Sequence, residues 1–208
     1  PARLNLVLLA VPSVSALLLL WAASHPPGPA RLAAALAFGA VNNTLFALLH
    51  ESVHGVLHPN GAVNRWGGRL AAAFFGTGLS LQRAFHLTHH RFNRTVHERF
   101  DYLQPGESPG LKRAQWYAIL TGVYWCFVPL GAVVYLVAPG LLRARPLRDP
   151  GSAMAHQTAA ETYLAALDDL SPGVARAEVL LTIAGHAALV WVTGVSLTGW
   201  LACYGAFA

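Results

Sequence analysis

The sequence predicts an all-α fold, a polytopic membrane bundle of about four spanning helices with short interfacial or re-entrant helices. Of its 208 residues, 55% are hydrophobic and only 11% are charged, whereas a soluble domain carries roughly 25% charged residues. The apolar residues are gathered into runs of about 20, the length that crosses a hydrocarbon core of about 30 Å. We therefore expect residues 1–208 to form a single membrane domain.

Four apolar stretches have the length of a spanning helix, and they are residues 4–23, 31–49, 116–142 and 179–204. A short proline-rich turn separates the first two stretches, which predicts a tight antiparallel hairpin. The third stretch contains Pro129 and Gly131, so we expect a kink or a tilt there. The first stretch has Arg3 as its only preceding basic residue and is long enough to span, which argues against a cleavable signal peptide.

Two further segments have a helical pattern without the length of a span. Residues 69–81 are too short and too rich in glycine to cross a membrane, so we expect a re-entrant or interfacial helix. Residues 152–170 place apolar side chains at helical spacing, which predicts a helix lying at the membrane interface.

Basic residues indicate the topology, because cytoplasmic loops collect Lys and Arg. Residues 51–115 hold Arg65, Arg69, Arg83, Arg91, Arg94, Arg99, Lys112 and Arg113. This segment is therefore predicted to be cytoplasmic, as is the N-terminus two spans earlier. The connection over residues 143–178 would then lie outside, although it also carries four arginines, namely Arg143, Arg145, Arg148 and Arg176, which conflicts with the rule.

The chain has a net charge of +5, and its arginines lie in loops between apolar spans. We therefore expect them to set the membrane topology and to contact anionic lipid. We therefore expect no nucleic-acid partner. The chain is rich in Ala, Leu and Arg, and Lys112 is its only lysine, which is typical of a GC-rich bacterial genome. The expected location is the bacterial inner membrane. Cys126 and Cys203 both lie in apolar runs, so neither a disulfide nor a cysteine ligand is predicted.

Five of the ten histidines form two clusters beside apolar helices. The first is His50-Glu51-Ser52-Val53-His54. Residues four apart share one face of a helix, so both imidazoles reach one region. The sequence His-Glu-x-x-His is also a zinc-protease motif, in which the glutamate is the general base.

The second cluster, His86-Leu87-Thr88-His89-His90, distinguishes a protease with one zinc ion from a protein with a larger metal centre. On a helix, all three of its histidines point to one side. One zinc ion rarely takes more than three or four protein ligands, so five imidazoles favour two metal ions. Two spans bring both clusters to the same membrane face, and nitrogen-rich ligation with open positions suits iron and oxygen chemistry.

The two clusters with their flanks, His50-Glu51-Ser52-Val53-His54-Gly55 and His86-Leu87-Thr88-His89-His90-Arg91, resemble the first two histidine boxes of the membrane fatty acid desaturase superfamily. That superfamily includes acyl desaturases, acyl or sphingolipid hydroxylases, and carotenoid ketolases and hydroxylases. Asn64 and the stretch from Arg91 through Tyr102 are similar to family flanks. The similarity runs from residue 42 to residue 117, and beyond it only the hydropathy agrees.

The resemblance implies a di-iron centre at the cytosolic membrane face, held by His50, His54, His86, His89 and His90. It also implies O2 as co-substrate and an external electron carrier of the ferredoxin, rubredoxin or cytochrome type. The expected function is an oxygen-dependent lipid oxidoreductase that introduces a double bond into a fatty acyl chain. A hydroxylase or ketolase of lipids or carotenoids is the alternative on the same scaffold.

Two alternatives of other classes stay open. An intramembrane zinc protease would use His50, Glu51 and His54, and it would need an acidic ligand from another span. The spans that follow the boxes have no such residue at their centres. An inactive relative that binds metal or haem is the other alternative, because the family's third box, His-x-x-His-His, has no match in the chain.

The missing third box leads us to expect a chain truncated after Ala208, with that box beyond it. His156 and His186 are isolated, and His186 is expected to be a buried histidine that hydrogen-bonds to a neighbouring helix.

Four polar residues near the boxes have two interpretations each. His58 continues the stripe of the first box by one turn before Pro59-Asn60-Gly61 ends the helix, and a capping or solvated role is its alternative. Glu51 is interpreted as a carboxylate that orients an imidazole rather than as a general base. His97 is assigned to a polar loop rather than to the iron shell, and Asn43 either hydrogen-bonds a ligand or packs between helices.

Overall fold

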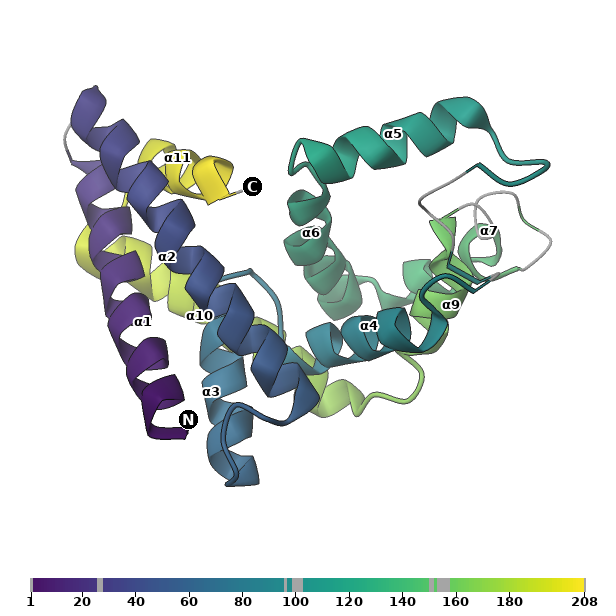
Figure 1. The fold of residues 1–208 in the computed structure, drawn as a ribbon, viewed down its shortest axis with the longest axis horizontal. Helices are drawn as coiled ribbons and strands as arrows, with labels where there is room; N and C mark the ends of the chain where they lie inside the picture. Colours follow the sequence, from purple (N-terminus) through teal and green to yellow (C-terminus); the bar gives the residue numbers. More distant parts are fainter. Residues whose placement is uncertain are drawn as a thin grey trace. The chain divides into compact units, whose positions relative to one another are not determined.

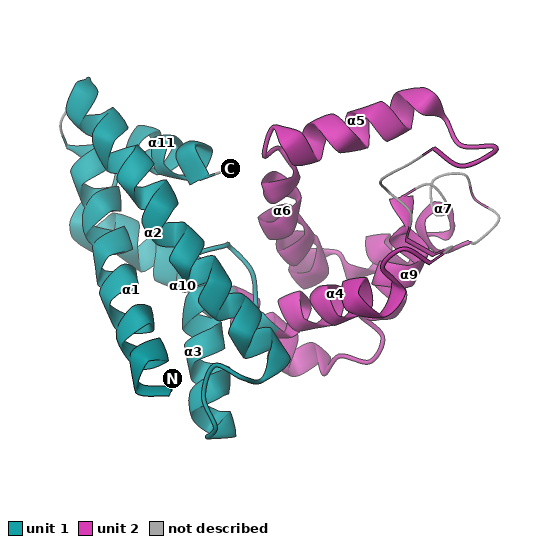
Figure 2. Ribbon diagram, viewed as in Figure 1, with its two compact units in different colours: residues 1–79, 180–208 teal, residues 80–179 magenta. Residues whose placement is uncertain are grey.

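The computed structural model of the chain describes residues 2–25, 28–95, 97–98, 103–149, 152 and 158–207. Over these residues every named element is a helix, and the only β-type pairing is an isolated bridge between Asn93 and Glu98. The all-α prediction is therefore confirmed. The chain forms two compact units, unit 1 with residues 1–79 and 180–208, and unit 2 with residues 80–179 (Figure 2).

Unit 1 contains the helices α1 (Ala2–Ser24), α2 (Pro29–His54), α3 (Gly61–Ala73), residues 180–193 of α10 (Pro172–Thr193) and α11 (Leu197–Phe207). Helices α1 and α2 form the predicted hairpin and lie side by side (Figure 1). Their joint is fixed by Arg31, whose Nε donates to the backbone oxygen of Ala23 at 2.9 Å. The spans expected over residues 4–23 and 31–49 are thus confirmed.

Helix α11 packs closely on the hairpin because glycines line the contact. A Cβ atom on Gly39 of α2 would lie 2.9 Å from the backbone oxygen of Ala206. A Cβ atom on Gly199 of α11 would lie 2.7 Å from Cα of Ser24. Small residues let helix backbones approach in this way within membranes.

Unit 2 contains α4 (Leu79–Phe92), α5 (Pro109–Leu120), α6 (Tyr124–Val137), the 3-10 helix η1 (Pro139–Arg143), α7 (Arg145–Arg148), α9 (Ala160–Ala165) and the first part of α10. Its core is formed by the buried residues Leu81, Ala132, Tyr135, Leu164, Leu167, Ala175 and Val179. These residues come from α4, α6, the α9 region and α10, so one apolar cluster holds these helices together.

Within the described ranges three helices, α1, α2 and α10, are long and apolar enough to cross a membrane, and the bent pair α5 and α6 makes a fourth if it counts as one span. The span expected over residues 116–142 is not one unbroken helix, because α5 and α6 meet at 96°. The break lies at Gly122, which is left-handed with φ 75°. The bend therefore lies before α6, at Gly122, whereas Pro129 lies inside α6.

The span expected over residues 179–204 is likewise wrong as one helix. Helix α10 begins earlier, at Pro172, and ends at Thr193. Gly194, with φ 66°, follows directly, and α11 begins at Leu197. A left-handed glycine directly after the last turn is a common helix stop.

The two shorter predictions are corrected in the same way. Residues 69–81 are not one helix, because α3 ends at Ala73 and α4 begins at Leu79. Of residues 152–170, the structure describes only a short helix, α9, and residues 153–157 are outside the described part of the chain. His156 belongs to that undescribed segment.

Candidate metal centre

The first histidine box lies on the last two turns of α2. The ring centroids of His50 and His54 are 4.7 Å apart, and their ligating nitrogens lie within 4.8 Å of each other. Helix α2 ends at His54 because Gly55 takes the left-handed conformation, φ 81°, and its N–H bonds back to the oxygen of Ser52. The predicted pairing of the two imidazoles on one helix face is therefore present.

Hydrogen bonds between α2 and α3 hold this end of α2. Ser52, inside the box, donates its hydroxyl to the backbone oxygen of Asn64 at 2.8 Å. In return, Nδ2 of Asn64 donates to the backbone oxygen of Ser52 at 3.0 Å. Both side chains are buried, and Gly68 of α3 leaves the space that the Ser52 side chain fills. Asn64, quoted above as a family flank, thus supports the backbone of the first box.

The second box lies on the last two turns of α4. His86 and His90 point the same way, with their Nε2 atoms 2.9 Å apart and their ring centroids 4.6 Å apart. The ring of His89 lies 6.3 Å from that of His86 and 5.8 Å from that of His90. The three predicted histidines are therefore neighbours, but His89 has a different hydrogen-bonding environment.

His89 contacts a residue that sequence reasoning missed. Its Nδ1 lies 2.6 Å from Oε1 of Glu98, and the hydroxyl of Tyr163 donates to the same oxygen at 2.5 Å. Burial and the bond to Glu98 raise the pKa of Tyr163 above its ordinary value. In the sequence, Glu98 is an acidic residue nine positions after His89, and Tyr163 lies 65 positions further on. Neither spacing corresponds to a helical pattern, so the contact could not be predicted.

The remaining polar residues near the boxes have other roles. His58 does not continue the helical stripe, because α2 ends before it, and its Nδ1 accepts the N–H of Asn60 at 3.0 Å. Glu51 is exposed, and the carboxylate of Glu98 is the one that hydrogen-bonds to a boxed imidazole in the described part of the chain. His97 is exposed in a loop, as expected, with its ring 5.3 Å from Phe92.

Three further expectations concern residues away from the boxes. His186 donates from Nε2 to the backbone oxygen of Ala73 at 2.9 Å, which is the predicted helix-to-helix bond. Asn43 is exposed, and the preceding Asn42 is the buried amide of α2. Cys126 and Cys203 are free, which agrees with the prediction that they form no disulfide.

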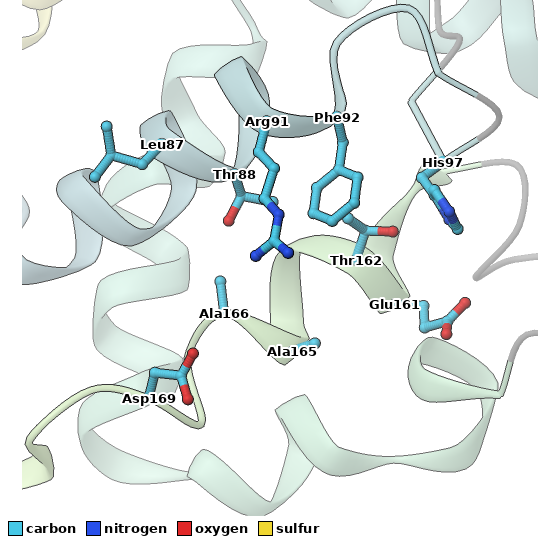
Figure 3. A pocket seen from close by; sticks show the side chains of 10 residues that line it. All are labelled: Leu87, Thr88, Arg91, Phe92, His97, Glu161, Thr162, Ala165, Ala166 and Asp169. Carbon is cyan, nitrogen blue, oxygen red and sulfur yellow. The ribbon is translucent and has the colours of Figure 1, made fainter.

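A pocket in unit 2 lies against another side of α4. Its volume is about 410 Å³, and its lining residues are Leu87, Thr88, Arg91, Phe92, His97, Glu161, Thr162, Ala165, Ala166 and Asp169. In Figure 3 the side chain of Arg91 reaches from α4 into the space beside α9. None of the five boxed histidines lines this pocket.

The donor set suits a transition metal. Each box places two imidazoles close together, His50 with His54 and His86 with His90. Imidazole nitrogen is the commonest protein ligand for such ions. A hydrogen bond from the second ring nitrogen, as at His89, is the usual arrangement for a ligating histidine.

Comparison with known proteins identifies the family. No curated protein and no solved structure matches the chain. A sequence model described as fatty acid desaturase matches residues 27–208, a range that includes both histidine boxes. Because this match covers most of the sequence, the chain belongs to the fatty acid desaturase family.

Proposed function

We propose that the chain is an oxygen-dependent, di-iron lipid oxidoreductase that introduces a double bond into a fatty acyl chain. The proposed iron ligands are His50, His54, His86, His89 and His90. The observation that carries the proposal is the presence of two histidine boxes, each on the final turns of a helix, inside the matched family region.

Family membership supports the broader part of this proposal, because the family is one of membrane oxidoreductases that act on lipids. Bound iron would activate O2 for attack on an unactivated C–H bond. The protein's own part is to present neutral imidazole nitrogens and to keep water away with apolar helices. We also propose that residues 1–208 act as one membrane domain, because the matched family region includes residues of both units.

The electron donor is proposed to be a separate carrier of the ferredoxin, rubredoxin or cytochrome type. The candidate spans support an integral membrane protein. The basic residues between α2 and α5 favour a cytoplasmic position for both boxes, and the composition favours a bacterial inner membrane.

Hydroxylation or ketolation of a lipid or carotenoid is the second candidate reaction, because it shares the first C–H abstraction with desaturation. An intramembrane zinc protease is less well supported. Glu178, the acid within α10, already accepts a hydrogen bond from the backbone N–H of Ser80. An inactive metal-binding relative is a further candidate, and the absence of any new lipid product would favour it.

Product analysis tests the proposal. The full-length protein is expressed in bacterial membranes with a reducing system, and total lipids are compared by mass spectrometry with those of the His90→Ala variant. We expect lipids lighter by two hydrogens from the wild type and none from His90→Ala. His25→Ala is the matched control, because His25 is an exposed histidine at the end of α1. Lipids heavier by one oxygen would favour the hydroxylase, and identical lipids from wild type and His90→Ala would contradict an oxidase.

A further inference from the structure

Glu98 is a buried carboxylate that joins His89 to Tyr163. It is 4% exposed, and its Oε1 lies 2.6 Å from Nδ1 of His89 and 2.5 Å from the hydroxyl of Tyr163. Its other oxygen, Oε2, is also buried and has no hydrogen-bond partner among the described residues. Burying a carboxylate is unfavourable unless donors face it. A buried acid at this position therefore needs an explanation, and its two hydrogen-bond partners supply one.

A tight turn after α4 brings Glu98 back to His89. Arg94 takes the left-handed conformation with φ 62°, and its N–H donates to the backbone oxygen of Glu98 at 3.2 Å. The N–H of Glu98 in turn donates to the backbone oxygen of Thr95 at 3.1 Å. The hydroxyl of Thr95 donates to the backbone oxygen of Phe92 at 2.6 Å, which ties the turn to the end of α4. The position of the carboxylate is thus set by backbone bonds within the turn.

Tyr163 reaches Glu98 because the core of unit 2 fixes α9. Leu164, the next residue, and Leu167 are buried in that core. The ring of Tyr163 also contacts that of Phe85, on α4, with centroids 6.1 Å apart. Its hydroxyl is therefore held in place by packing rather than by Glu98 alone, and it can in turn hold the carboxylate.

We infer that Glu98 is a positioning residue for His89, and that Tyr163 holds Glu98 in place. Oε1 of Glu98 already accepts the hydroxyl hydrogen of Tyr163, and a carboxylate oxygen in this role accepts a second hydrogen from Nδ1 of His89, so we assign the ring hydrogen to Nδ1. Nε2 then keeps its lone pair and is the atom available to a metal ion. The network selects one tautomer and one ring orientation for His89. This inference rests on the proposed function, because it takes His89 to be an iron ligand.

The tautomer is measured first, in metal-free protein, so that the readout does not depend on activity. Histidine is labelled with nitrogen-15 in the full chain in detergent, and the His89 signals are assigned by their loss in His89→Ala. At a pH where imidazoles are neutral, we expect the wild type to carry the hydrogen on Nδ1. Glu98→Ala should move the population toward Nε2–H, whereas Glu98→Gln, which keeps an acceptor oxygen, should retain the wild-type tautomer.

Iron affinity is measured second, by competition with a chelator. Removal of a partner that orients a metal ligand typically lowers affinity by about 10- to 100-fold. We expect a loss of this size in Glu98→Ala, a smaller loss in Tyr163→Phe, and partial recovery in Glu98→Gln. Glu161→Gln is the matched control, because it changes a half-buried carboxylate two residues from Tyr163. Circular dichroism of each variant checks that the helices persist.

The two hypotheses fail in different ways. A wild-type His89 with its hydrogen on Nε2, or a Glu98→Ala variant with unchanged tautomer and iron affinity, would overturn the positioning role. A wild-type chain that holds no iron would overturn the proposed function, and the tautomer of His89 would still decide whether Glu98 orients that ring.

Discussion

The backbone N–H of Ser80 donates to Oε2 of Glu178 at 2.7 Å, so a carboxylate of α10 caps the first turn of α4. Glu178 is only 6% exposed. The first N–H groups of a helix have no partner within it, and a negative charge there also opposes the positive end of the helix dipole. The contact therefore fixes the start of the helix whose last turns carry the second histidine box.

Replacement of this cap should destabilise unit 2. We expect Glu178→Ala to lower the free energy of unfolding by about 1–3 kcal/mol, because it leaves the partly buried N–H of Ser80 without its acceptor. Thermal unfolding in detergent, followed by circular dichroism, measures the change. Glu161→Ala, at a half-buried position of α9, should change stability far less. Equal stability of Glu178→Ala and the wild type would show that the cap does not support α4.

A side chain at Gly68 should disturb the first box. A Cβ atom there would lie 2.8 Å from Cβ of Ser52 and 2.9 Å from Cδ1 of Leu79. We expect Gly68→Ala to cost about 1–3 kcal/mol of stability, as overpacking usually does, and to weaken iron binding through displacement of α2. Gly61→Ala is the control, because a Cβ atom there meets only Nη1 of Arg65, at 3.4 Å. Iron content and unfolding temperature of both variants are the measurements.

Substitution of His186 should lower stability, whereas substitution of His90 should lower iron content. His186→Ala removes the bond to the backbone oxygen of Ala73 and leaves that oxygen without this partner. We expect a loss of stability of about 1–3 kcal/mol with the iron content unchanged. His90→Ala should lower iron content and remove activity. Loss of iron in His186→Ala without unfolding would place His186 in the metal shell, against our assignment.

Tyr163 should make the stability of unit 2 fall at high pH. Burial, the bond to Glu98 and the charge of Glu98 raise the pKa of Tyr163 in the folded protein above 10.0. The stabilising contribution of Tyr163 is complete below pH 10.0, which is the pKa of its hydroxyl in the unfolded chain. It is lost as the pH rises toward the higher pKa that the hydroxyl has in the folded protein. The wild type should therefore lose stability above pH 10.0 more steeply than Tyr163→Phe. Chemical unfolding at several pH values checks this, and parallel curves would contradict it.

Hydropathy predicted α1 and α2 well because no residue ends the helix within either apolar run. Pro12 lies inside α1 without ending it. It failed where glycines with positive φ stop a helix inside an apolar run. Gly122 separates α5 from α6, and Gly194 separates α10 from α11. A hydropathy average does not register such a stop, because these residues change the direction of the backbone without changing its polarity.

The histidine clusters could be recognised in the sequence because residues three or four positions apart share one helix face. The contacts of Glu98 with His89 and Tyr163 could not be recognised in this way. Glu98 reaches His89 only through the turn at Arg94, and Tyr163 lies 65 residues beyond Glu98. Glu51, the acid inside the first box, was the more obvious choice in sequence, yet it is exposed. Contacts made through a turn or through core packing require the fold.

The metal content of the purified full-length protein tests the central claim most directly. Elemental analysis would compare the wild type with His54→Ala, His89→Ala and the control His25→Ala, all isolated from iron-replete cells. We predict two iron ions per chain in the wild type and in His25→Ala, and a clear loss in each of the other two variants. Zinc as the main metal, or full iron content in both His54→Ala and His89→Ala, would contradict the di-iron assignment.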